Sequence, residues 1–173
     1  LAAWDTYIDG RYRIAVTRIG EDPALLPCPE GHWESLPALA VAGNRRCFAA
    51  RCRERLVDLP GGAVNHHSEL VVAVQDSAVW RDVACIDIDY SLNPWMAAYW
   101  GLRRFPRLVA DSDSVFLMWE EKLDPAAMDP GLGRLCGIAV SADGVVGEPS
   151  ILMDGRCMIV IESESSAPIV RAA

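Results

Sequence analysis

One stretch of the sequence, residues 87–105, gathers side chains that could bind a polar ligand. Aromatic rings offer flat apolar faces to the C–H face of a sugar, while arginine and aspartate make directional hydrogen bonds to hydroxyl or carboxylate groups. The side chains of this stretch that we predict to bind ligand are Tyr90, Trp95, Tyr99, Trp100, Arg103 and Arg104. In the alternative interpretation the tryptophans fill gaps between packed sheets and the arginines lie on solvated rims.

Three carboxylates close apolar, strand-like segments, namely Asp5, Glu120 and Glu121. Glycoside hydrolysis uses two carboxylates about 5 to 10 Å apart, and on that ground we predict these three as candidate catalytic residues. In the alternative interpretation they are solvated charges at strand ends or acceptors in turns. The adjacent His66 and His67 point opposite ways on an extended chain, so we predict no metal site, and we predict no cofactor.

The elements that would position these residues recur along the chain. An apolar run that leads to a large side chain occurs at residues 1–5, 48–52 and 116–120. The second and third of these runs follow a proline-led segment and a short polar turn, which predicts hairpins over residues 37–52 and 106–122. Downstream come β-branched runs at 14–17, 72–75 and 138–141, and then weaker runs at 23–26, 79–85 and 145–152.

This order of four runs is typical of a propeller blade, and helical periodicity is poor throughout. We therefore predict an all-β fold, a β-propeller fragment of about two to three four-stranded antiparallel blades. The predicted single segment 1–173 divides into a partial blade (1–31), two blades (32–92 and 93–156) and a further strand or tail (157–173). The first five residues already read as the interior of a strand, so we expect an upstream segment and further blades in the parent protein.

Four segments are expected to open on one face of such a fold, since loops between second and third strands and between blades lie together there. These segments are residues 23–36, 56–67, 87–105 and 123–133. A rigid scaffold that positions variable loops is where binding residues gather. This face is therefore the predicted functional face.

The segments LAAWDTYIDGRYRIAVTRI, LPALAVAGNRRCFAARCRE, FPRLVADSDSVFLMWEEK and GIAVSADGVVGEPSIL resemble the sialidase-like, BNR-repeat group of propellers in pattern and blade order. The Asp-box of that group, Ser-x-Asp-x-Gly-x-x-Trp, is echoed by Ser141–Gly144, where the glycine comes one residue early and the tryptophan is absent. The resemblance implies an arginine cluster for a carboxylate, a tyrosine nucleophile with a glutamate partner and an aspartate acid. It does not assign these roles to particular residues of this sequence.

Composition narrows the function classes. The chain has 24 Asp and Glu against 16 Lys and Arg and a net charge of -8, which argues against a nucleic-acid partner. No apolar run reaches the roughly 18 to 20 residues of a membrane-spanning helix. The 6 cysteines form no C-x-x-C pair; Cys47, Cys136 and Cys157 lie in apolar runs and are expected to be buried, while some of the 6 could pair in an oxidising compartment. We expect an extracellular or periplasmic location.

Three functions stay open at this point. The first is a propeller-type binding module for a glycan or a protein partner, which the aromatic and arginine cluster of residues 87–105 favours. The second is a sialidase-like glycoside hydrolase whose catalytic set is completed by missing blades. The third is a purely structural β-rich piece whose acidic surface keeps it soluble. Whatever the function, we expect the isolated 173 residues to aggregate or dissolve poorly, because a propeller fragment leaves two edge strands unpaired.

Overall fold

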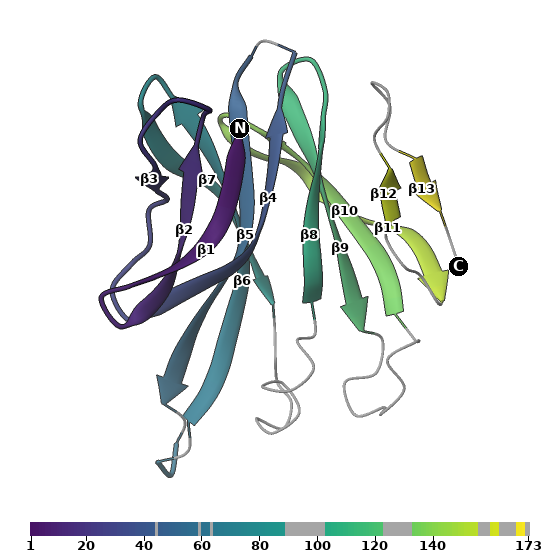
Figure 1. The fold of residues 1–173 in the computed structure, drawn as a ribbon. Helices are drawn as coiled ribbons and strands as arrows, with labels where there is room; N and C mark the ends of the chain where they lie inside the picture. The colour runs from purple at the N-terminus through teal and green to yellow at the C-terminus, as the bar shows by residue number, and fades with distance from the viewer. Residues whose placement is uncertain are drawn as a thin grey trace.

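The chain folds into antiparallel β-sheets (Figure 1). In this computed structural model the described residues are 1–43, 45–58, 60–62, 64–88, 103–122, 133–155, 160–162 and 169–171. These ranges contain strands and turns but no helix. They therefore contain no membrane-spanning helix. The strands are β1 (Ala2–Ile8), β2 (Arg11–Thr17), β3 (Ala24–Leu25), β4 (His32–Val41), β5 (Cys47–Asp58), β6 (Val64–Asp76), β7 (Val79–Ile88), β8 (Arg103–Ala110), β9 (Ser114–Lys122), β10 (Gly133–Ser141), β11 (Gly144–Gly155), β12 (Val160–Glu162) and β13 (Ile169–Arg171). The predicted all-β class is confirmed.

The strands follow one another in simple meanders. β4-β5-β6-β7 and β8-β9-β10-β11 are four-stranded sheets in which each strand pairs antiparallel with the next one along the chain. β1, β2 and β3 form a three-stranded sheet, and β12 pairs with β13. The hairpins predicted over residues 37–52 and 106–122 are therefore present as β4–β5 and β8–β9, the first hairpins of the two four-stranded sheets.

The β1–β2 hairpin shows how the sequence directs these meanders. Ile8 pairs with Arg11, which leaves a loop of Asp9 and Gly10 with φ of 53° and 79°. A two-residue hairpin loop with positive φ at both positions suits the right-handed twist of the strands, and glycine adopts that conformation at little cost.

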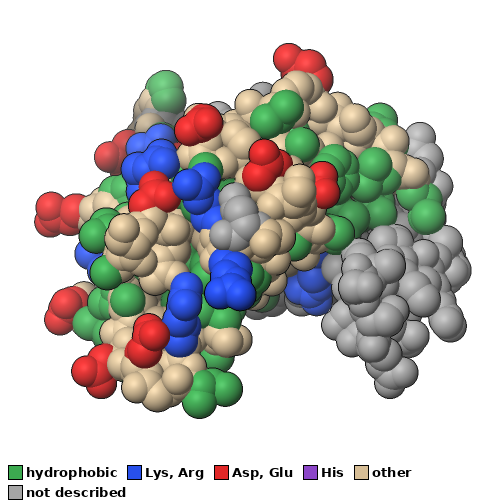
Figure 2. Space-filling view, turned by 90° about the horizontal axis from the view of Figure 1, so that it is seen from above, with side chains coloured by type: hydrophobic (Ala, Val, Ile, Leu, Met, Phe, Trp, Pro, Cys, Tyr) green, Lys and Arg blue, Asp and Glu red, His purple; other side chains and the backbone are tan. Residues whose placement is uncertain are grey.

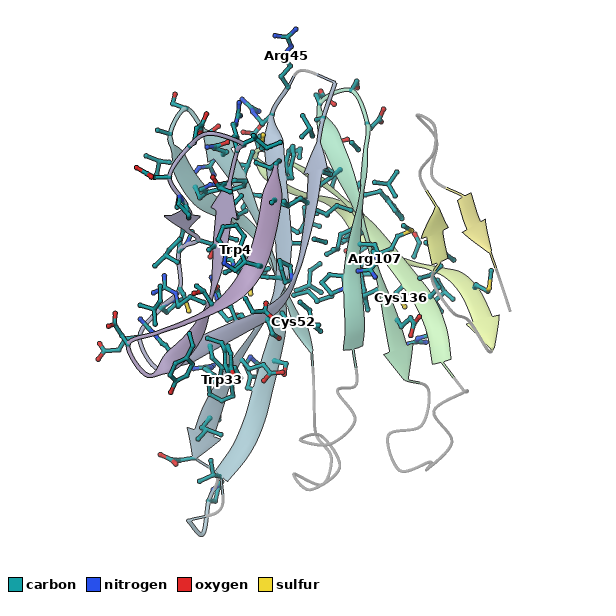
Figure 3. The ribbon with its side chains drawn as sticks, viewed as in Figure 1. Trp4, Trp33, Arg45, Cys52, Arg107 and Cys136 are labelled. Carbon is teal, nitrogen blue, oxygen red and sulfur yellow. The ribbon has the colours of Figure 1, made fainter. Side chains whose placement is uncertain are left out.

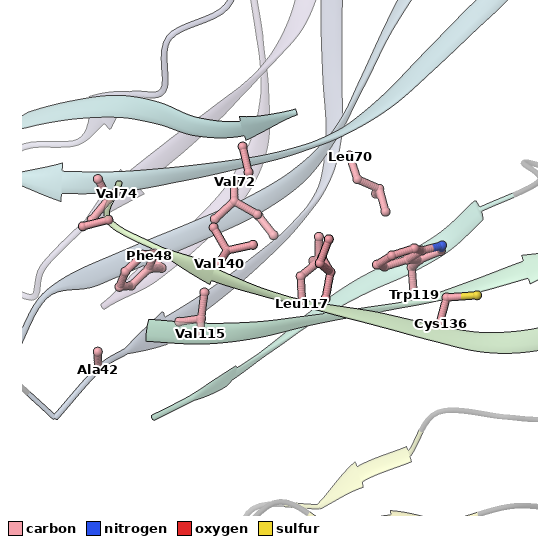
Figure 4. Packing of buried hydrophobic residues seen from close by; sticks show 14 of the residues in the cluster. Ala42, Phe48, Leu70, Val72, Val74, Val115, Leu117, Trp119, Cys136 and Val140 are labelled. Carbon is pink, nitrogen blue, oxygen red and sulfur yellow. The ribbon is translucent and has the colours of Figure 1, made fainter. Parts of the chain in front are cut away.

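The middle sheet, β4–β7, is covered on both faces. Its larger core lies against the β8–β11 sheet, where Phe48, Leu70 and Val72 meet Leu117 and Trp119 (Figure 4). Each of these side chains is at most 2% exposed. This tight apolar packing fixes the two four-stranded sheets against each other.

The opposite face of the middle sheet packs on the β1–β3 sheet through a smaller core. Ile14 and Val16 of β2 meet Ala49, Ala73 and Trp80 of the middle sheet. Alternation along β5 therefore sends neighbouring side chains into different cores, which requires both sets to be apolar or internally paired.

The two four-stranded sheets approach each other most closely at their first strands. β4 lies against β8, whereas the fourth strands β7 and β11 make few contacts. The turns after β4 and β8 are also joined, because the Gly43 N–H donates to the Asp111 carbonyl at 2.9 Å. A Cβ atom at Gly43 would lie 3.2 Å from the carbonyl oxygen of Ser112, so a glycine suits this approach.

The segment 56–67, predicted as a loop, is mostly strand. Leu56 pairs with His66 and Asp58 with Val64, so β5 and β6 continue as a two-stranded hairpin beyond the last residues that β4 and β7 cover (Figure 1). The prediction took the glycines near the turn to mark a long loop, but the cross-strand pairing extends almost to them. Figure 1 shows this turn and the β1–β2 turn at the same end of the molecule, which we call the hairpin end; the β4–β5 turn lies at the opposite end, the turn end.

Candidate functional site

A cluster of four charged side chains lies between the middle sheet and the β1–β3 sheet; we call Glu34, Arg51, Arg53 and Asp82 the ionic cluster. Arg51 Nε donates to Glu34 Oε1 at 2.6 Å and Arg51 Nη2 to Asp82 Oδ1 at 2.7 Å. Arg53 makes the parallel pair, with Nε at 3.1 Å from Glu34 Oε1 and Nη2 at 2.6 Å from Asp82 Oδ2. Two positive and two negative charges therefore balance inside the protein.

Burial makes this balance necessary. The side chains of Glu34 and Arg51 are 0% exposed, and that of Arg53 is 7% exposed. Burial lowers the pKa of Arg53, but the hydrogen bonds and charges of Asp82 and Glu34 outweigh burial, and the pKa is raised overall. Arg53 therefore stays charged, and both guanidinium groups hold neighbouring backbone in place.

The backbone they hold is the β3–β4 connection. Pro27 O accepts from Arg51 Nη2 at 2.7 Å and from Arg53 Nη2 at 2.9 Å. From the other side, Arg13 Nη2 donates to Leu26 O at 2.8 Å. Arginine hydrogen bonds from two sheets thus fix this connection, which belongs to the predicted functional face.

An exposed aromatic pair lies at the hairpin end of the β1–β3 sheet. Tyr7 and Tyr12 are directly opposite each other on β1 and β2, with ring centroids 5.2 Å apart and ring planes at 66°. They are 65% and 53% exposed. Alternation places them on the face that carries Ala3 and Val16, but beyond the residues that reach the core. The tyrosine pair thus continues the inner face of the sheet as a surface open to solvent.

A second aromatic side chain of the hairpin end is held by a carboxylate. Trp33 Nε1 donates to Glu54 Oε2 at 2.6 Å across the β4–β5 pair, and Ser68 Oγ lies 3.5 Å from Glu54 Oε1. Figure 3 shows Trp33, on β4, nearer to this end than Trp4, which is on β1. Exposed apolar side chains, Leu56 and Val64, follow on the projecting β5–β6 hairpin.

The predicted ligand-binding residues fall largely outside the described ranges. Tyr90, Trp95, Tyr99 and Trp100 lie outside them. Arg103 and Arg104 begin β8, where they pair in register with Glu121 and Glu120 of β9. Their backbone therefore lies at the hairpin end, and their ligand-binding role stays a prediction.

The structure does not bring the predicted catalytic carboxylates together. The expectation that Asp5 ends its strand is wrong, because β1 continues to Ile8 before the chain turns back. Glu120 and Glu121 do lie near the end of β9. The middle sheet lies between the sheet that contains Asp5 and the sheet that contains Glu120 and Glu121.

Asp5 nevertheless has a distinct environment. Partial burial raises the pKa of its carboxyl, while a backbone hydrogen bond from Leu36 acts in the opposite direction. Leu36 has a φ of 56° and lies where the β4–β5 register is irregular. Asp5 therefore acts as an acceptor that supports this irregular stretch of β4.

Sequence reasoning missed both the ionic cluster and the tyrosine pair. Arg51 and Arg53 interrupt an apolar run at a spacing of two residues, which puts both on one face of a strand and was the available signal for a buried ionic network. For Tyr7 and Tyr12 the signal was the Asp9-Gly10 dipeptide, which predicts the hairpin that places them opposite each other.

The described cysteines and histidines form no metal centre. Within the described ranges no group of three His, Cys, Asp or Glu side chains could hold a metal ion. Cys47 and Cys136 are buried, as expected, and Cys157 lies outside the described residues. His66 and His67 pair with different residues of β5, and His67 Nε2 lies 3.4 Å from Glu69 Oε1.

Comparisons of the chain with protein-family models, with curated proteins and with solved structures found no match. The functional assignment therefore depends on the geometry of the hairpin end.

Proposed function

We propose that the chain is part of a β-propeller and that it binds carbohydrate at the hairpin end. The propeller part of the proposal draws support from two sheets that repeat one four-stranded meander and lie closest at their first strands. Wedge-like packing of this kind is what radial blades require. β1 to β3 would then be the second to fourth strands of a preceding blade.

The exposed tyrosine pair is the observation that carries the carbohydrate part. Two aromatic side chains that are 65% and 53% exposed lie side by side on an ordered sheet rather than on a free loop. Rings with a polar hydroxyl suit a sugar, which presents C–H groups on its face and hydroxyls at its edge. Trp33, held through Glu54, supplies a further aromatic side chain at the same end.

The rigidity of the hairpin end favours a binding role for its aromatic side chains over chance exposure. The ionic cluster and Arg13 fix the connection that leads into β4, so the start of β4 with Trp33 is held in place. A preorganised surface loses little entropy when a ligand binds. We propose binding rather than hydrolysis because Asp5 and Glu120 lie in sheets that the middle sheet separates.

The proposal is tested by screening the chain on a glycan array and measuring affinity for the best ligand by calorimetry. Replacing both tyrosines (Tyr7→Ala with Tyr12→Ala) is expected to weaken binding by about tenfold for each ring lost. The pair Tyr7→Phe with Tyr12→Phe keeps the rings and is expected to retain most of the affinity. Trp4→Ala is the matched control, since Trp4 points to the opposite face of β1.

Two outcomes would refute the proposal. One is a failure of the tyrosine pair as the site: either the chain binds no glycan on the array, or it binds the same glycan equally well without the tyrosine rings. The other is a ligand that proves to be a protein, recognised when binding survives deglycosylation of the partner and free sugar does not compete.

A further inference from the structure

A second surface, at the turn end and far from the tyrosine pair, is hollowed between the β1–β3 sheet and the middle sheet. One hollow has a volume of about 380 Å³ and is lined by Leu1, Arg18, Ile19, Val41, Arg45 and Cys47. Its walls are mostly apolar: Ile19 is 98% exposed and Val41 49% exposed. A hollow of this size is within the range of small-molecule sites.

The two arginines of this hollow lack carboxylate partners among the described residues. Arg18 Nη2 donates to two neutral groups, Cys47 Sγ and Gln75 Oε1, each at 3.3 Å. Arg45 lies in the β4–β5 turn with a φ of 63° and is exposed; its backbone N–H donates to Ala42 O at 2.8 Å, but its side chain makes no hydrogen bond or ion pair within the described part of the chain. Two positive charges thus border an apolar hollow without local neutralisation.

Two neighbouring arginines at the same end share one carboxylate, that of Asp76. Arg46 Nε lies 3.8 Å from Asp76 Oδ1, and Arg81 Nη2 lies 3.1 Å from Asp76 Oδ2. Figure 2, which views the molecule from this end, shows several positively charged side chains on this face, with Asp and Glu side chains beside them. In a chain of net charge -8, two arginines without a carboxylate partner among the described residues are a local exception that attracts an anion.

A second hollow, of about 430 Å³, adjoins the first at Leu1 and Arg18 and has a different character. Its polar lining includes Gln75 and Ser77, and Glu21 and Asp22 stand in its wall. These carboxylates disfavour a second negative charge on a ligand that reaches past Arg18. The charge arrangement therefore selects a ligand with one anionic group.

We propose that the turn end binds a small amphipathic monocarboxylate. Its carboxylate pairs with Arg18, which lines both hollows, and Arg45, which projects outward from the β4–β5 turn (Figure 3), adds a second positive charge at the rim. Its apolar body covers Ile19 and Val41 and removes their exposed surface from water. This site is independent of the carbohydrate proposal, because it uses other residues at the opposite end.

The test uses octanoate as the probe with the full chain, by calorimetry and by ligand-observed saturation-transfer NMR. Octanoate is expected to bind, whereas 1-octanol (no charge), acetate (no apolar body) and octanedioate (a second carboxylate) are each expected to bind at least about tenfold more weakly. Binding is also expected to weaken with added salt, because the attraction is between partly exposed charges.

Variants assign the binding to this hollow. Arg18→Gln and Arg45→Gln are each expected to weaken octanoate binding several-fold, and Ile19→Asp is expected to abolish it. Arg81→Gln is the matched control, an arginine of the same end that is already paired with a carboxylate. Unchanged melting curves for Arg45→Gln, whose side chain is at the surface, show that the fold is intact.

Three results would overturn the proposal: no octanoate binding, equal binding of 1-octanol, or octanoate binding that Arg18→Gln and Arg45→Gln leave unchanged.

Discussion

Replacing Glu34 by glutamine tests the idea that the ionic cluster stabilises the middle sheet and the β3–β4 connection that it binds. The substitution keeps the shape of the side chain, so no cavity forms and packing is unchanged. It removes the negative charge that Arg51 Nε and Arg53 Nε approach to 2.6 and 3.1 Å. Asp82 alone then faces two buried guanidinium groups, which leaves one positive charge inside the protein without compensation.

The expected loss of stability is large. Removing one partner of a buried ion pair typically costs about 3 to 5 kcal/mol, because the remaining charge stays desolvated. The near-complete burial of Glu34 and Arg51 places this pair in that class. For a chain of this length each kcal/mol lowers the melting temperature by about 2 to 4 °C. Glu34→Gln is therefore expected to lower the melting temperature by roughly 6 to 20 °C.

The assay is thermal and urea unfolding followed by circular dichroism, with two comparison variants. Arg81→Gln removes an ion pair whose side chains are 53% and 44% exposed, and its cost is expected to be about 0 to 1 kcal/mol. Combining Glu34→Gln with Arg51→Met removes the uncompensated charge and is expected to recover part of the loss. If Glu34→Gln lowers the free energy of unfolding by no more than Arg81→Gln does, the reasoning about the ionic cluster is refuted.

Three further outcomes can be measured on the same chain. Gly137→Ala is expected to lower the free energy of unfolding in urea by about 1 to 3 kcal/mol, because the added Cβ would lie 2.3 Å from Phe116 Cε1. Adding Phe116→Leu should restore part of this stability, and an unchanged free energy of unfolding for Gly137→Ala would contradict the packing described for β9 and β10. Burial raises the pKa of Asp5 above 3.8, so ionisation costs stability as pH rises from 3.8 through the folded pKa. Asp5→Asn should therefore melt higher than the parent chain at pH 7 but not at pH 3, and an equal gain at both pH values would exclude this cause. Exposed Cys85 should react with iodoacetamide before Cys28, because burial and the charge of Glu34 raise the pKa of the Cys28 thiol. If mass spectrometry finds the reverse order, the β3–β4 connection that contains Cys28 is open to solvent.

Hairpins and strand order could be predicted from the sequence because apolar runs separated by turn residues specify them locally. Both first hairpins and the β-branched third strands lie where the repeat places them. The end of β1 was missed because a strand continues as long as cross-strand pairing continues, and no residue near Asp5 forces a stop.

Which way each strand faces could not be predicted. The repeat matched Val72 with Ile138 and Val74 with Val140, yet Val72 and Val74 face the β8–β11 sheet while Ile138 and Val140 face back toward the middle sheet. When both faces of a sheet are buried, apolar residues occupy successive positions and a shift by one residue leaves the pattern unchanged. The positions of Asp5 and Glu120 relative to each other could not be predicted either, because the sequence pattern does not fix which way each strand faces.

The two faces of the middle sheet differ in chemistry, and this difference bears on both proposed sites. The face toward β8–β11 is held by apolar side chains such as Leu70 and Trp119, whereas the other face relies in part on Glu34 and Arg51. Buried ionic contacts contribute little net stability compared with apolar packing, and the core that the middle sheet shares with the β1–β3 sheet is the smaller one, so the β1–β3 sheet is the more weakly attached of the two neighbours. The tyrosine pair and the Arg18 hollow both include residues of this sheet or of the loop that follows β2. A ligand that contacts both the β1–β3 sheet and the middle sheet at either end is therefore expected to stabilise the chain against unfolding.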